Sequence, residues 1–262
     1  MKIIVCAKQV PDTTEVRIDP VKGTLIRDGV PSILNPDDKN ALEEALKIKE
    51  KQPDATVTIL SMGPPQAEDA LREALAMGAD RAILLSDREF AGADTWATSA
   101  TLAAAIKKIG DYDLIFCGRQ AIDGDTAQVG PQIAERLDLP QVTYVEKLTI
   151  HRDKLEVHRA LEDGYEIIEM KLPALLTAVK ELNEPRYPSI EGIFDAYGEK
   201  QVEVWRAKDL QVDPNHIGLK GSPTQVKKSF TPEAKGKGEM LKGNGKDVVI
   251  QLLMNLKKKH II

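Results

Sequence analysis

DLIFCGRQAIDGDTAQVGPQIAERL, residues 113–137, joins an apolar run to a glycine-containing loop and an amphipathic segment. The run at 113–118 predicts a buried strand, and the pattern at 125–137 predicts a helix. Pro131 would lie six residues into this helix, where a proline removes a backbone hydrogen bond and clashes with the preceding turn. The helix could therefore begin at Pro131 instead and leave 124–130 as a loop. Such a turn leaves backbone N–H groups free for a phosphate, although Asp123 or Asp125 could equally be a plain helix N-cap.

The same alternation of strand and helix precedes this segment. Short β-rich runs at 3–7, 56–62 and 82–86 predict strands, and helical patterns occupy about 37–50, 66–77 and 95–109. Strand, helix and strand at this spacing predict an α/β fold with a mainly parallel sheet flanked by helices. Ligands bind beyond the carboxyl ends of the strands in such sheets.

The pattern changes after about residue 142. QVTYVEKLTI, KLEVHRAL, YEIIEMKL and ALLTAV predict antiparallel strands at one edge of the sheet, joined by the turns RDK (152–154) and EDG (162–164). Residues 219–246 are rich in Gly, Lys, Ser and Pro and predict an extended arm, followed by an amphipathic helix at about 246–259. We expect a nucleotide-binding domain at 1–185, a partner-recognition segment at 186–218, and an arm at 219–262 that packs on a partner.

Composition excludes several classes of protein. The chain is 42% hydrophobic and 29% charged, and no apolar run of 18 or more residues predicts a membrane span. The N-terminus has neither the apolar length nor the cleavage site of a signal peptide. Cys6 and Cys117 each lie in an apolar run, as core thiols of a cytoplasmic protein would. Two cysteines and four scattered histidines predict no metal site.

Charge is distributed unevenly along the chain. Residues 220–262 contain ten lysines against three acidic residues, so this tail carries +7 although the whole chain carries −5. A basic tail could bind nucleic acid, but no aromatic residues alternate with the lysines as base-stacking platforms would. We therefore expect a solvated tail, or one that docks on an acidic partner, and no nucleic acid.

No catalytic motif is present, so the candidate ligand-binding segments are those at strand ends and helix starts. The sequence contains no GxSxG, HExxH, Walker loop or GxGxxG, and we predict no catalytic residue. AKQVPDT (7–13) and SMGPP (61–65) follow the first two strands. In AGADTWATSATLAAAIKKIG (91–110), Asp94 is a good N-cap, and three hydroxyl side chains crowd the first helical turn: Thr95, Thr98 and Ser99.

Several of these segments together carry a family resemblance. VCAKQVPDT, LNPDDKNALEEAL, SMGPP, ALAMGADRA, GRQAIDGDTAQVGPQIAERL and VKELNEPRYPSIEGI occur in an order similar to that of the electron-transfer flavoprotein β subunit, from residue 2 to about 210. The resemblance implies an adenine-nucleotide α-hydrolase-like domain. It also implies a partner, the α subunit, which carries an electron-shuttling FAD.

The resemblance also implies a set of nucleotide-binding residues. The end of the first strand contributes backbone contacts, NPDD contributes Asn35 as a polar contact to the adenosine, and SMGPP contributes a van der Waals or backbone contact. Within the phosphate loop, Thr126 and Gln128 are the expected side-chain contacts. The full set is Cys6, Ala7, Asn35, Pro36, Asp37, Asp38, Met62, Asp123, Gly124, Asp125, Thr126, Ala127, Gln128, Val129, Gly130, Pro131, Gln132, Ile133 and Ala134.

Two kinds of family member differ in the nucleotide of this subunit. GADTWATS (92–99) resembles the bifurcating, two-FAD type of anaerobic bacteria, which accepts hydride from NADH and divides the electrons between a ferredoxin and the FAD of the α subunit. FAD must extend beyond the adenosine pocket, where Asp94, Thr95, Thr98 and Ser99 would supply donors. The alternative is the AMP-binding type, with these residues only a polar helix start and Trp96 a core residue.

The resemblance further implies a docking loop at about 187–201. Ile190 takes the position of the hydrophobic anchor for an acyl-CoA or 2-hydroxy acid dehydrogenase, unless it simply packs on the body of the protein. Two distant alternatives are an ATP-using enzyme and a nucleotide sensor without a redox role. The first needs a Gly/Ser-rich loop after the first strand, which AKQVPDT lacks, and the second explains neither NEPRYPSIEGI nor the long tail.

Overall fold

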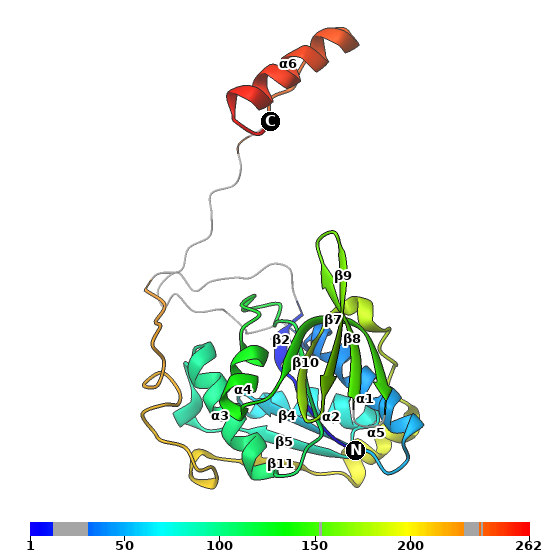
Figure 1. Ribbon diagram of the computed structural model, residues 1–262. Helices are drawn as coiled ribbons and strands as arrows, with labels where there is room; N and C mark the ends of the chain where they lie inside the picture. The colour runs from blue at the N-terminus through cyan, green and yellow to red at the C-terminus, as the bar shows by residue number, and fades with distance from the viewer. Residues whose placement is uncertain (13–30, 152–153, 228–235, 237) are drawn as a thin grey trace. The chain divides into compact units, whose positions relative to one another are not determined.

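The computed structural model describes residues 1–12, 31–151, 154–227, 236 and 238–262. The described residues up to Lys227 belong to one compact unit, and those beyond it belong to a second. Figure 1 shows the first unit as a sheet between helices and the second as one helix. Part of the predicted extended arm, and two residues of the predicted turn at 152–154, lie outside the described residues.

A nine-stranded sheet with the order β11-β5-β4-β1-β6-β10-β7-β8-β9 forms the first unit. Every neighbouring pair from β11 to β7 is parallel, whereas β8 and β9 add antiparallel strands at one edge. This confirms the predicted α/β class. The strands are Lys2–Cys6 (β1), Thr56–Met62 (β4), Arg81–Leu85 (β5), Leu114–Gly118 (β6), Gln141–His151 (β7), Lys154–Leu161 (β8), Gly164–Lys171 (β9), Ala174–Ala178 (β10) and Val202–Trp205 (β11), and a separate antiparallel pair comprises Gln9–Pro11 (β2) and Ser32–Leu34 (β3).

Helices cover both faces of the sheet. Ile3 and Val5 of β1 belong to the core shared with α1 and α2, whereas Ile4 and Cys6 belong to the core shared with α3 and α4. The strands are therefore apolar on both sides, which is typical of parallel sheets. The helices are Pro36–Lys51 (α1), Glu68–Met77 (α2), Thr95–Ile109 (α3), Val129–Leu137 (α4) and Ile190–Gly198 (α5).

The strand order reverses at β1. The chain passes from β1 to β4 and β5 on one side, and then places β6 on the other side of β1. Connections that leave β1 and β6 at their carboxyl ends consequently diverge, and this divergence opens a crevice in which ligands bind in doubly wound sheets. The topology alone places the candidate site above β1 and β6.

The strand at ALLTAV differs from its prediction. It was expected to be antiparallel at the sheet edge, but β10 is parallel to both of its neighbours and lies between β6 and β7. All five of its residues are buried, as in an interior strand. The error has a physical reason: β10 follows two antiparallel strands in the chain, and sequence adjacency does not reveal that the chain returns to the centre of the sheet.

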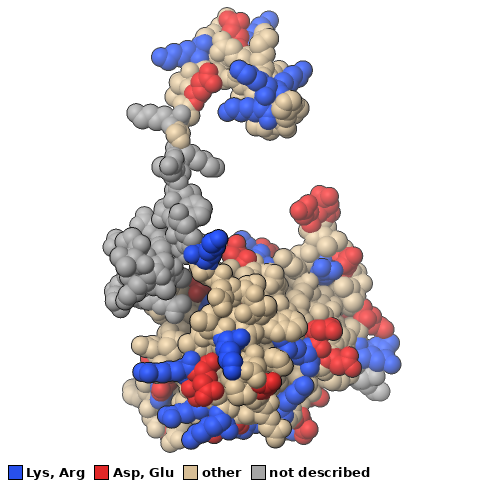
Figure 2. Space-filling model, turned by 90° about the vertical axis from the view of Figure 1, so that its left-hand side faces the viewer, with Lys and Arg blue, Asp and Glu red and all other residues tan. Residues whose placement is uncertain are grey.

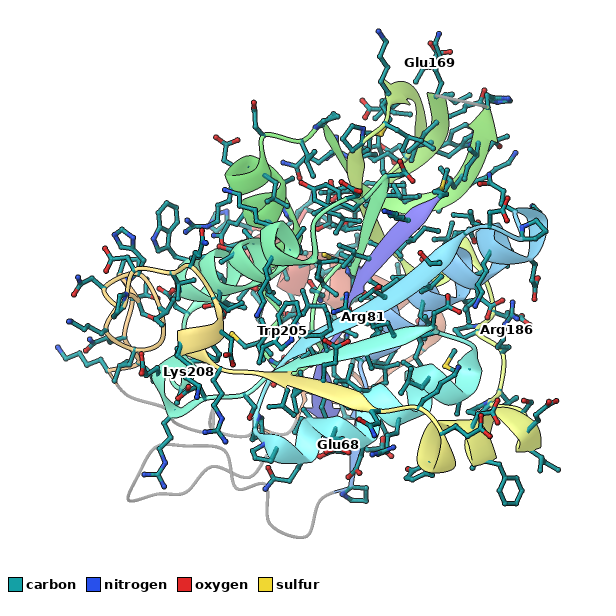
Figure 3. All side chains as sticks on the ribbon, turned by 90° about the horizontal axis from the view of Figure 1, so that it is seen from below. Glu68, Arg81, Glu169, Arg186, Trp205 and Lys208 are labelled. Atoms are coloured by element: carbon teal, nitrogen blue, oxygen red, sulfur yellow. The ribbon has the colours of Figure 1, made fainter. Side chains whose placement is uncertain are left out.

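β11 is a strand that the sequence pattern did not reveal. It pairs with β5 in parallel, and the Arg81 Nε lies 2.6 Å from the Glu203 Oε1 across the pair. The Lys108 Nζ lies 4.1 Å from the centre of the Trp205 ring. Figure 3 shows Arg81 and Trp205 at this edge of the sheet.

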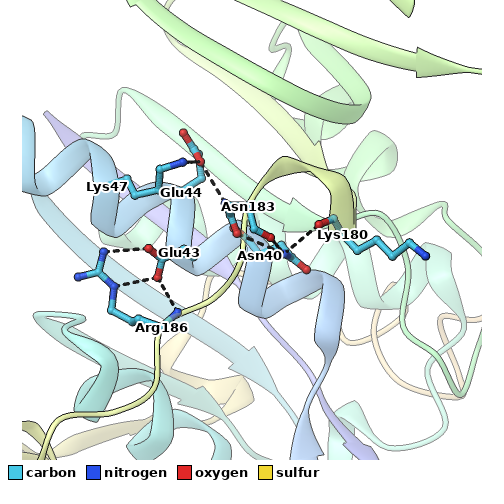
Figure 4. A network of polar contacts seen from close by, with 7 residues as sticks. All are labelled: Asn40, Glu43, Glu44, Lys47, Lys180, Asn183 and Arg186. Carbon is cyan, nitrogen blue, oxygen red and sulfur yellow. Dashed lines mark hydrogen bonds and ion pairs between the residues drawn. The ribbon is translucent and has the colours of Figure 1, made fainter. Parts of the chain in front are cut away.

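The segment around 187–201 contains a helix, α5, rather than the expected loop. Ser189 caps it by accepting a hydrogen bond from the Gly192 N–H. Upstream, Arg186 donates to both carboxylate oxygens of Glu43, and the Asn40 side chain donates to the Asn183 carbonyl at 2.7 Å (Figure 4). These contacts fix the NEPRY segment to α1.

The second unit contains the predicted terminal helix, α6, which spans Gly245–Lys258. Asn244 caps α6 by accepting from the Asp247 N–H at 3.0 Å. No residue of α6 is buried, and several of its apolar side chains are exposed, including those of Val249, Leu252 and Met254. Among the described residues of the second unit, α6 therefore has no core to pack against.

Candidate functional site: a cavity at the carboxyl ends of the strands

A cavity of about 670 Å³ opens at the carboxyl ends of β1, β4 and β6. It is lined by the strand ends, by the loop before α4 and by the first turn of α3. The predicted site residues that line it are Cys6, Ala7, Asp38, Met62, Asp94, Thr95, Thr98, Gly124, Thr126, Ala127, Gln128, Val129 and Gly130. Its size is that of a site for a small molecule or cofactor.

Cys6 and Cys117 lie side by side at the floor of the cavity. They are register partners on the parallel strands β1 and β6, and both thiols are free and buried. A hydrogen bond with Cys6 and burial raise the pKa of the Cys117 thiol well above its ordinary value. Both are therefore core thiols, as predicted, and the Cys117 thiol stays protonated at neutral pH.

Asp38 joins the ends of the two central strands. Its Oδ2 accepts from the Lys8 N–H at 2.8 Å, and its Oδ1 accepts from the Gly118 N–H at 2.9 Å. Burial raises the pKa of Asp38 to about 7, although these two hydrogen bonds oppose the shift. The carboxyl thus holds the crevice between β1 and β6 at a fixed width.

Asn35 lies next to the cavity but does not line it. It is fully buried, donates from Nδ2 to the Gln120 carbonyl at 2.9 Å and accepts at Oδ1 from the Ile122 N–H at 3.1 Å. Its amide is therefore engaged with the backbone of the loop that follows β6. In this structure Asn35 shapes the wall of the cavity.

The loop between β6 and α4 has a strained backbone. Asp125 and Ala127 both adopt left-handed conformations, each with φ of 51°. The Lys8 Nζ lies 2.7 Å from the Asp123 Oδ1, and the Gln120 side chain donates to Asp125. Left-handed residues within such a loop turn successive N–H groups toward one side, which forms a concave site for anions, and strain of this kind concentrates at functional sites.

Helix α4 begins at Val129, four residues later than the predicted 125 and two residues before the alternative start at Pro131. Pro131 lies in the first turn, where its missing N–H costs no helical hydrogen bond. A Cβ at Gly130 would lie 2.6 Å from the Thr177 Cγ2, so only glycine permits this close packing of α4 on β10. The N-terminus of α4 consequently faces the cavity directly.

The first turn of α3 forms the opposite wall. Thr95 donates from Oγ1 to the Gln128 Oε1 at 3.0 Å and accepts from the Gln132 Nε2 at 3.3 Å. These contacts connect the N-termini of α3 and α4. Thr98 also lines the cavity. Two helix N-termini therefore converge on one cavity, and the Asp94 carboxylate caps that of α3.

On α3, the FAD-binding hypothesis misplaced Ser99, and the AMP-binding alternative misplaced Trp96. Ser99 does not line the cavity: it is fully buried, donates to the Trp96 carbonyl and accepts from the Arg136 Nε at 3.0 Å. Trp96 is not a core residue, since 49% of it is exposed and the Arg136 guanidinium lies 4.1 Å from the centre of its ring. In a helix that begins at Thr95, residue 99 falls on the face turned toward α4, where it meets Arg136.

Asp94 lines the cavity with both carboxylate oxygens engaged. Oδ1 accepts from the Ala97 N–H at 3.0 Å, which caps α3, and Oδ2 accepts from the Thr224 N–H at 3.0 Å and hydroxyl at 2.7 Å. Burial raises the pKa of Asp94, but these hydrogen bonds outweigh it and leave the pKa below its ordinary value. The carboxylate therefore remains charged at neutral pH.

The remaining predicted residues surround the cavity without lining it. They are Asn35, Pro36, Asp37, Ser99, Asp123, Asp125, Pro131, Gln132, Ile133 and Ala134. Sequence reasoning missed Lys8, Arg119 and Gln120, although each directly follows a predicted strand end, and that position was the available signal. It also missed Thr224 and Val226, which line the cavity from a segment distant in sequence.

A second cavity, of about 710 Å³, lies on α3 away from the strand ends and is lined by residues such as Ala103, Lys107 and Asp213. It lacks the converging helix N-termini of the first. The face that Figure 2 shows mixes Lys and Arg with Asp and Glu in its described part, so it offers no continuous basic surface of the kind that binds nucleic acid. Within the described ranges, no helix has the length and apolarity to cross a membrane, and no three acidic, His or Cys side chains gather as metal ligands.

Comparisons with known proteins agree with this geometry. Residues 22–210 match the model of the electron transfer flavoprotein domain. The chain is 66% identical to an electron transfer flavoprotein subunit beta of Thermoanaerobacterium thermosaccharolyticum and 62% identical to a caffeyl-CoA reductase-Etf complex subunit of Acetobacterium woodii. It is 51% identical to an acryloyl-CoA reductase electron transfer subunit gamma of Anaerotignum propionicum. Each match covers the whole of both chains, and this chain therefore belongs to the electron transfer flavoprotein β-subunit family.

Proposed function

We propose that this chain binds FAD in the cavity at the strand ends and works as the β subunit of an electron-bifurcating electron transfer flavoprotein. The observation that carries the proposal is the convergence of two helix N-termini, those of α3 and α4, on one cavity. A mononucleotide with one phosphate needs only one of them. A ligand that extends from the crevice above β1 and β6 to α3 uses both.

The residues present fit an extended dinucleotide. The left-handed backbone at Asp125 and Ala127, together with the start of α4, offers N–H donors to a pyrophosphate. The buried side chains of Cys6 and Cys117 give the cavity an apolar contact surface, which suits a planar ring system or its ribose. Across the cavity, Thr95 and Thr98 supply hydroxyl groups at the positive end of α3.

The chain itself provides orientation and electrostatics. Thr95 is held by Gln128 and Gln132, so its hydroxyl is positioned before a ligand binds. The dipole of α3 favours negative charge at this wall. When bound, FAD would supply the redox chemistry: acceptance of hydride from NADH and separate delivery of the electrons to a ferredoxin and to the FAD of the α subunit.

The named relatives support a role within a larger assembly. Two of them are subunits of caffeyl-CoA and acryloyl-CoA reductase complexes. We propose that this chain pairs in the cytoplasm with an α subunit and delivers electrons to an acyl-CoA or 2-hydroxy acid dehydrogenase through α5. Ile190 at the start of α5 is 78% exposed, as a docking anchor would be.

The second candidate is an AMP-binding subunit without bifurcation. The loop at 124–128 and the start of α4 would suffice for a single phosphate. In that case Thr95 and Thr98 would face the cavity without a ligand group to contact. FAD is long enough to contact both walls of the cavity, the one at 124–128 and the one formed by Thr95 and Thr98.

Anaerobic addition of NADH to the purified α–β pair tests the proposal. We expect NADH to bleach the flavin absorbance, and we expect Thr98→Val to slow this reduction about tenfold or more because a donor facing the reacting ring is lost. Thr149→Val on β7 makes the same change outside the cavity lining and should have no effect. Failure of NADH to reduce any flavin in the pair would contradict the proposal.

A further inference from the structure

Residues 217–227, which we call the strap, close one side of the nucleotide cavity. Thr224 and Val226 line the cavity although they lie about 130 residues beyond the α3 residues opposite them. Val226 is 83% exposed, and an apolar side chain so exposed on a cavity wall becomes buried when a ligand fills the space. A ligand in the cavity would therefore add an apolar contact with Val226 of the strap.

The base of the strap is fixed to the loop that precedes α3. The Leu219 N–H donates to the Ala91 carbonyl at 2.9 Å. Gly218 has a φ of 56°, and a Cβ there would lie 2.0 Å from the Glu89 carbonyl oxygen. Only glycine allows this close approach, so the base cannot shift without breaking backbone contacts.

The upper part of the strap is held by one carboxylate. The Asp94 Oδ2 accepts two hydrogen bonds from Thr224, and the Asp94 N–H donates to the Ser222 Oγ at 2.8 Å. The Ser222 hydroxyl in turn donates to the Gly218 carbonyl at 2.7 Å. Because its other oxygen caps α3, Asp94 links the helix start to the strap and has no oxygen left unbonded for the ligand.

We infer that the strap is a gate over the nucleotide and that Asp94 is its positioning residue, which sets how fast the nucleotide leaves. The nucleotide fills the space beside Thr224 and Val226, and its departure requires the contact between Asp94 and Thr224 to open. This inference rests on the cavity being a nucleotide site. It does not depend on whether the nucleotide is FAD or AMP.

The test is the dissociation rate of the nucleotide that copurifies with the α–β pair, identified by chromatography and followed by ultrafiltration after dilution. Thr224→Val removes the hydroxyl donor with little change in volume, and we expect dissociation about tenfold faster, since a hydrogen bond to a charged group is lost. Thr224→Ser restores the hydroxyl and should restore the slow rate. Thr149→Val is the matched control and should leave the rate unchanged. A rate for Thr224→Val within about a factor of two of the unsubstituted pair, with either nucleotide, would overturn the gate.

Limited trypsin digestion gives an independent test. If the contact between Asp94 and Thr224 were merely structural, nucleotide would not change the rate at which trypsin cleaves the strap. The strap contains Lys220 and Lys227. Nucleotide in excess should slow cleavage after both lysines, and Thr224→Val should weaken this protection while the thermal unfolding midpoint stays unchanged. Equal cleavage rates with and without nucleotide would count against the gate. Release of AMP rather than FAD would contradict the proposed function but leave this test valid.

Discussion

Asp38 and Gly118 approach each other more closely than any other residue at position 118 would permit. The Asp38 Oδ1 accepts from the Gly118 N–H at 2.9 Å, and a Cβ at Gly118 would lie 2.3 Å from that same oxygen and 2.7 Å from the Asp38 N. The start of α1 thereby reaches the end of β6. This contact sets the width of the crevice in which the nucleotide is proposed to bind.

Gly118→Ala should separate α1 from β6. We expect a loss of about 1–3 kcal/mol in the free energy of unfolding, because the added methyl group meets backbone atoms and cannot be accommodated by a side-chain rotation. The pair should also retain less nucleotide after gel filtration. Gly198→Ala is the matched control, since a Cβ there meets nothing within 4 Å. Equal stability of the two variants would contradict the close approach.

Protonation of Asp38 should contribute to the pH dependence of stability. Burial raises the pKa of Asp38 from 3.8 to about 7, so the folded protein holds this proton more tightly than the unfolded chain does. Its contribution to stability is complete below about pH 4 and is lost as the pH rises to about 7. Urea unfolding at several pH values should therefore show a smaller decline over this window for Asp38→Asn. Burial also raises the pKa of Asp37, so part of the decline should remain in Asp38→Asn.

Relief of strain in the phosphate loop should stabilise the nucleotide-free protein. Ala127 has a φ of 51°, a conformation that costs a residue with a Cβ about 1–2 kcal/mol. Ala127→Gly should recover about 0.5–1 kcal/mol of the unfolding free energy once the greater chain entropy of glycine is included. Ala134→Gly, in the interior of α4, should instead destabilise the protein. Destabilisation by Ala127→Gly as well would show that the loop is unstrained.

The exposed end of α5 should govern electron delivery to the partner dehydrogenase. Truncation of Ile190, which is 78% exposed, removes an anchor of a kind worth about 2 kcal/mol or more at an interface. Ile190→Ala should therefore weaken delivery to the dehydrogenase about tenfold or more and leave reduction of a dye by NADH unchanged. Leu161→Ala removes an apolar side chain that is 50% exposed from the end of β8 and should change neither activity. Equal loss of both activities in Ile190→Ala would indicate damage to the fold instead.

Much of the fold could be predicted because its strands and helices carry strong local patterns. The apolar runs that became β1, β4, β5 and β6 alternate with amphipathic segments, and this spacing dictates a parallel sheet. The position of β10 in the centre of the sheet depends on tertiary packing, and no local sequence pattern indicates it. β11 is only four residues long, so its pairing with β5 could not be read from periodicity.

The candidate site, too, could be predicted where local sequence position decides and not where tertiary contacts decide. Chain position at strand ends and helix starts marked the segments that contain Ala7, Thr95 and Gln128, since topology brings these ends together, and the family resemblance named Ala7 and Gln128 within them. Ser99 was misplaced because its orientation depends on the contact with Arg136 of another helix. Thr224 was missed because only the folded chain brings it to Asp94.

The nucleotide content of the purified α–β pair tests the central claim most directly. Denaturation of the pair releases its bound nucleotides, which chromatography against FAD and AMP standards can identify and count. The convergence of α3 and α4 on one cavity leads us to expect two FAD molecules and no AMP per pair. Recovery of one FAD and one AMP per pair would contradict the claim that this subunit binds a flavin.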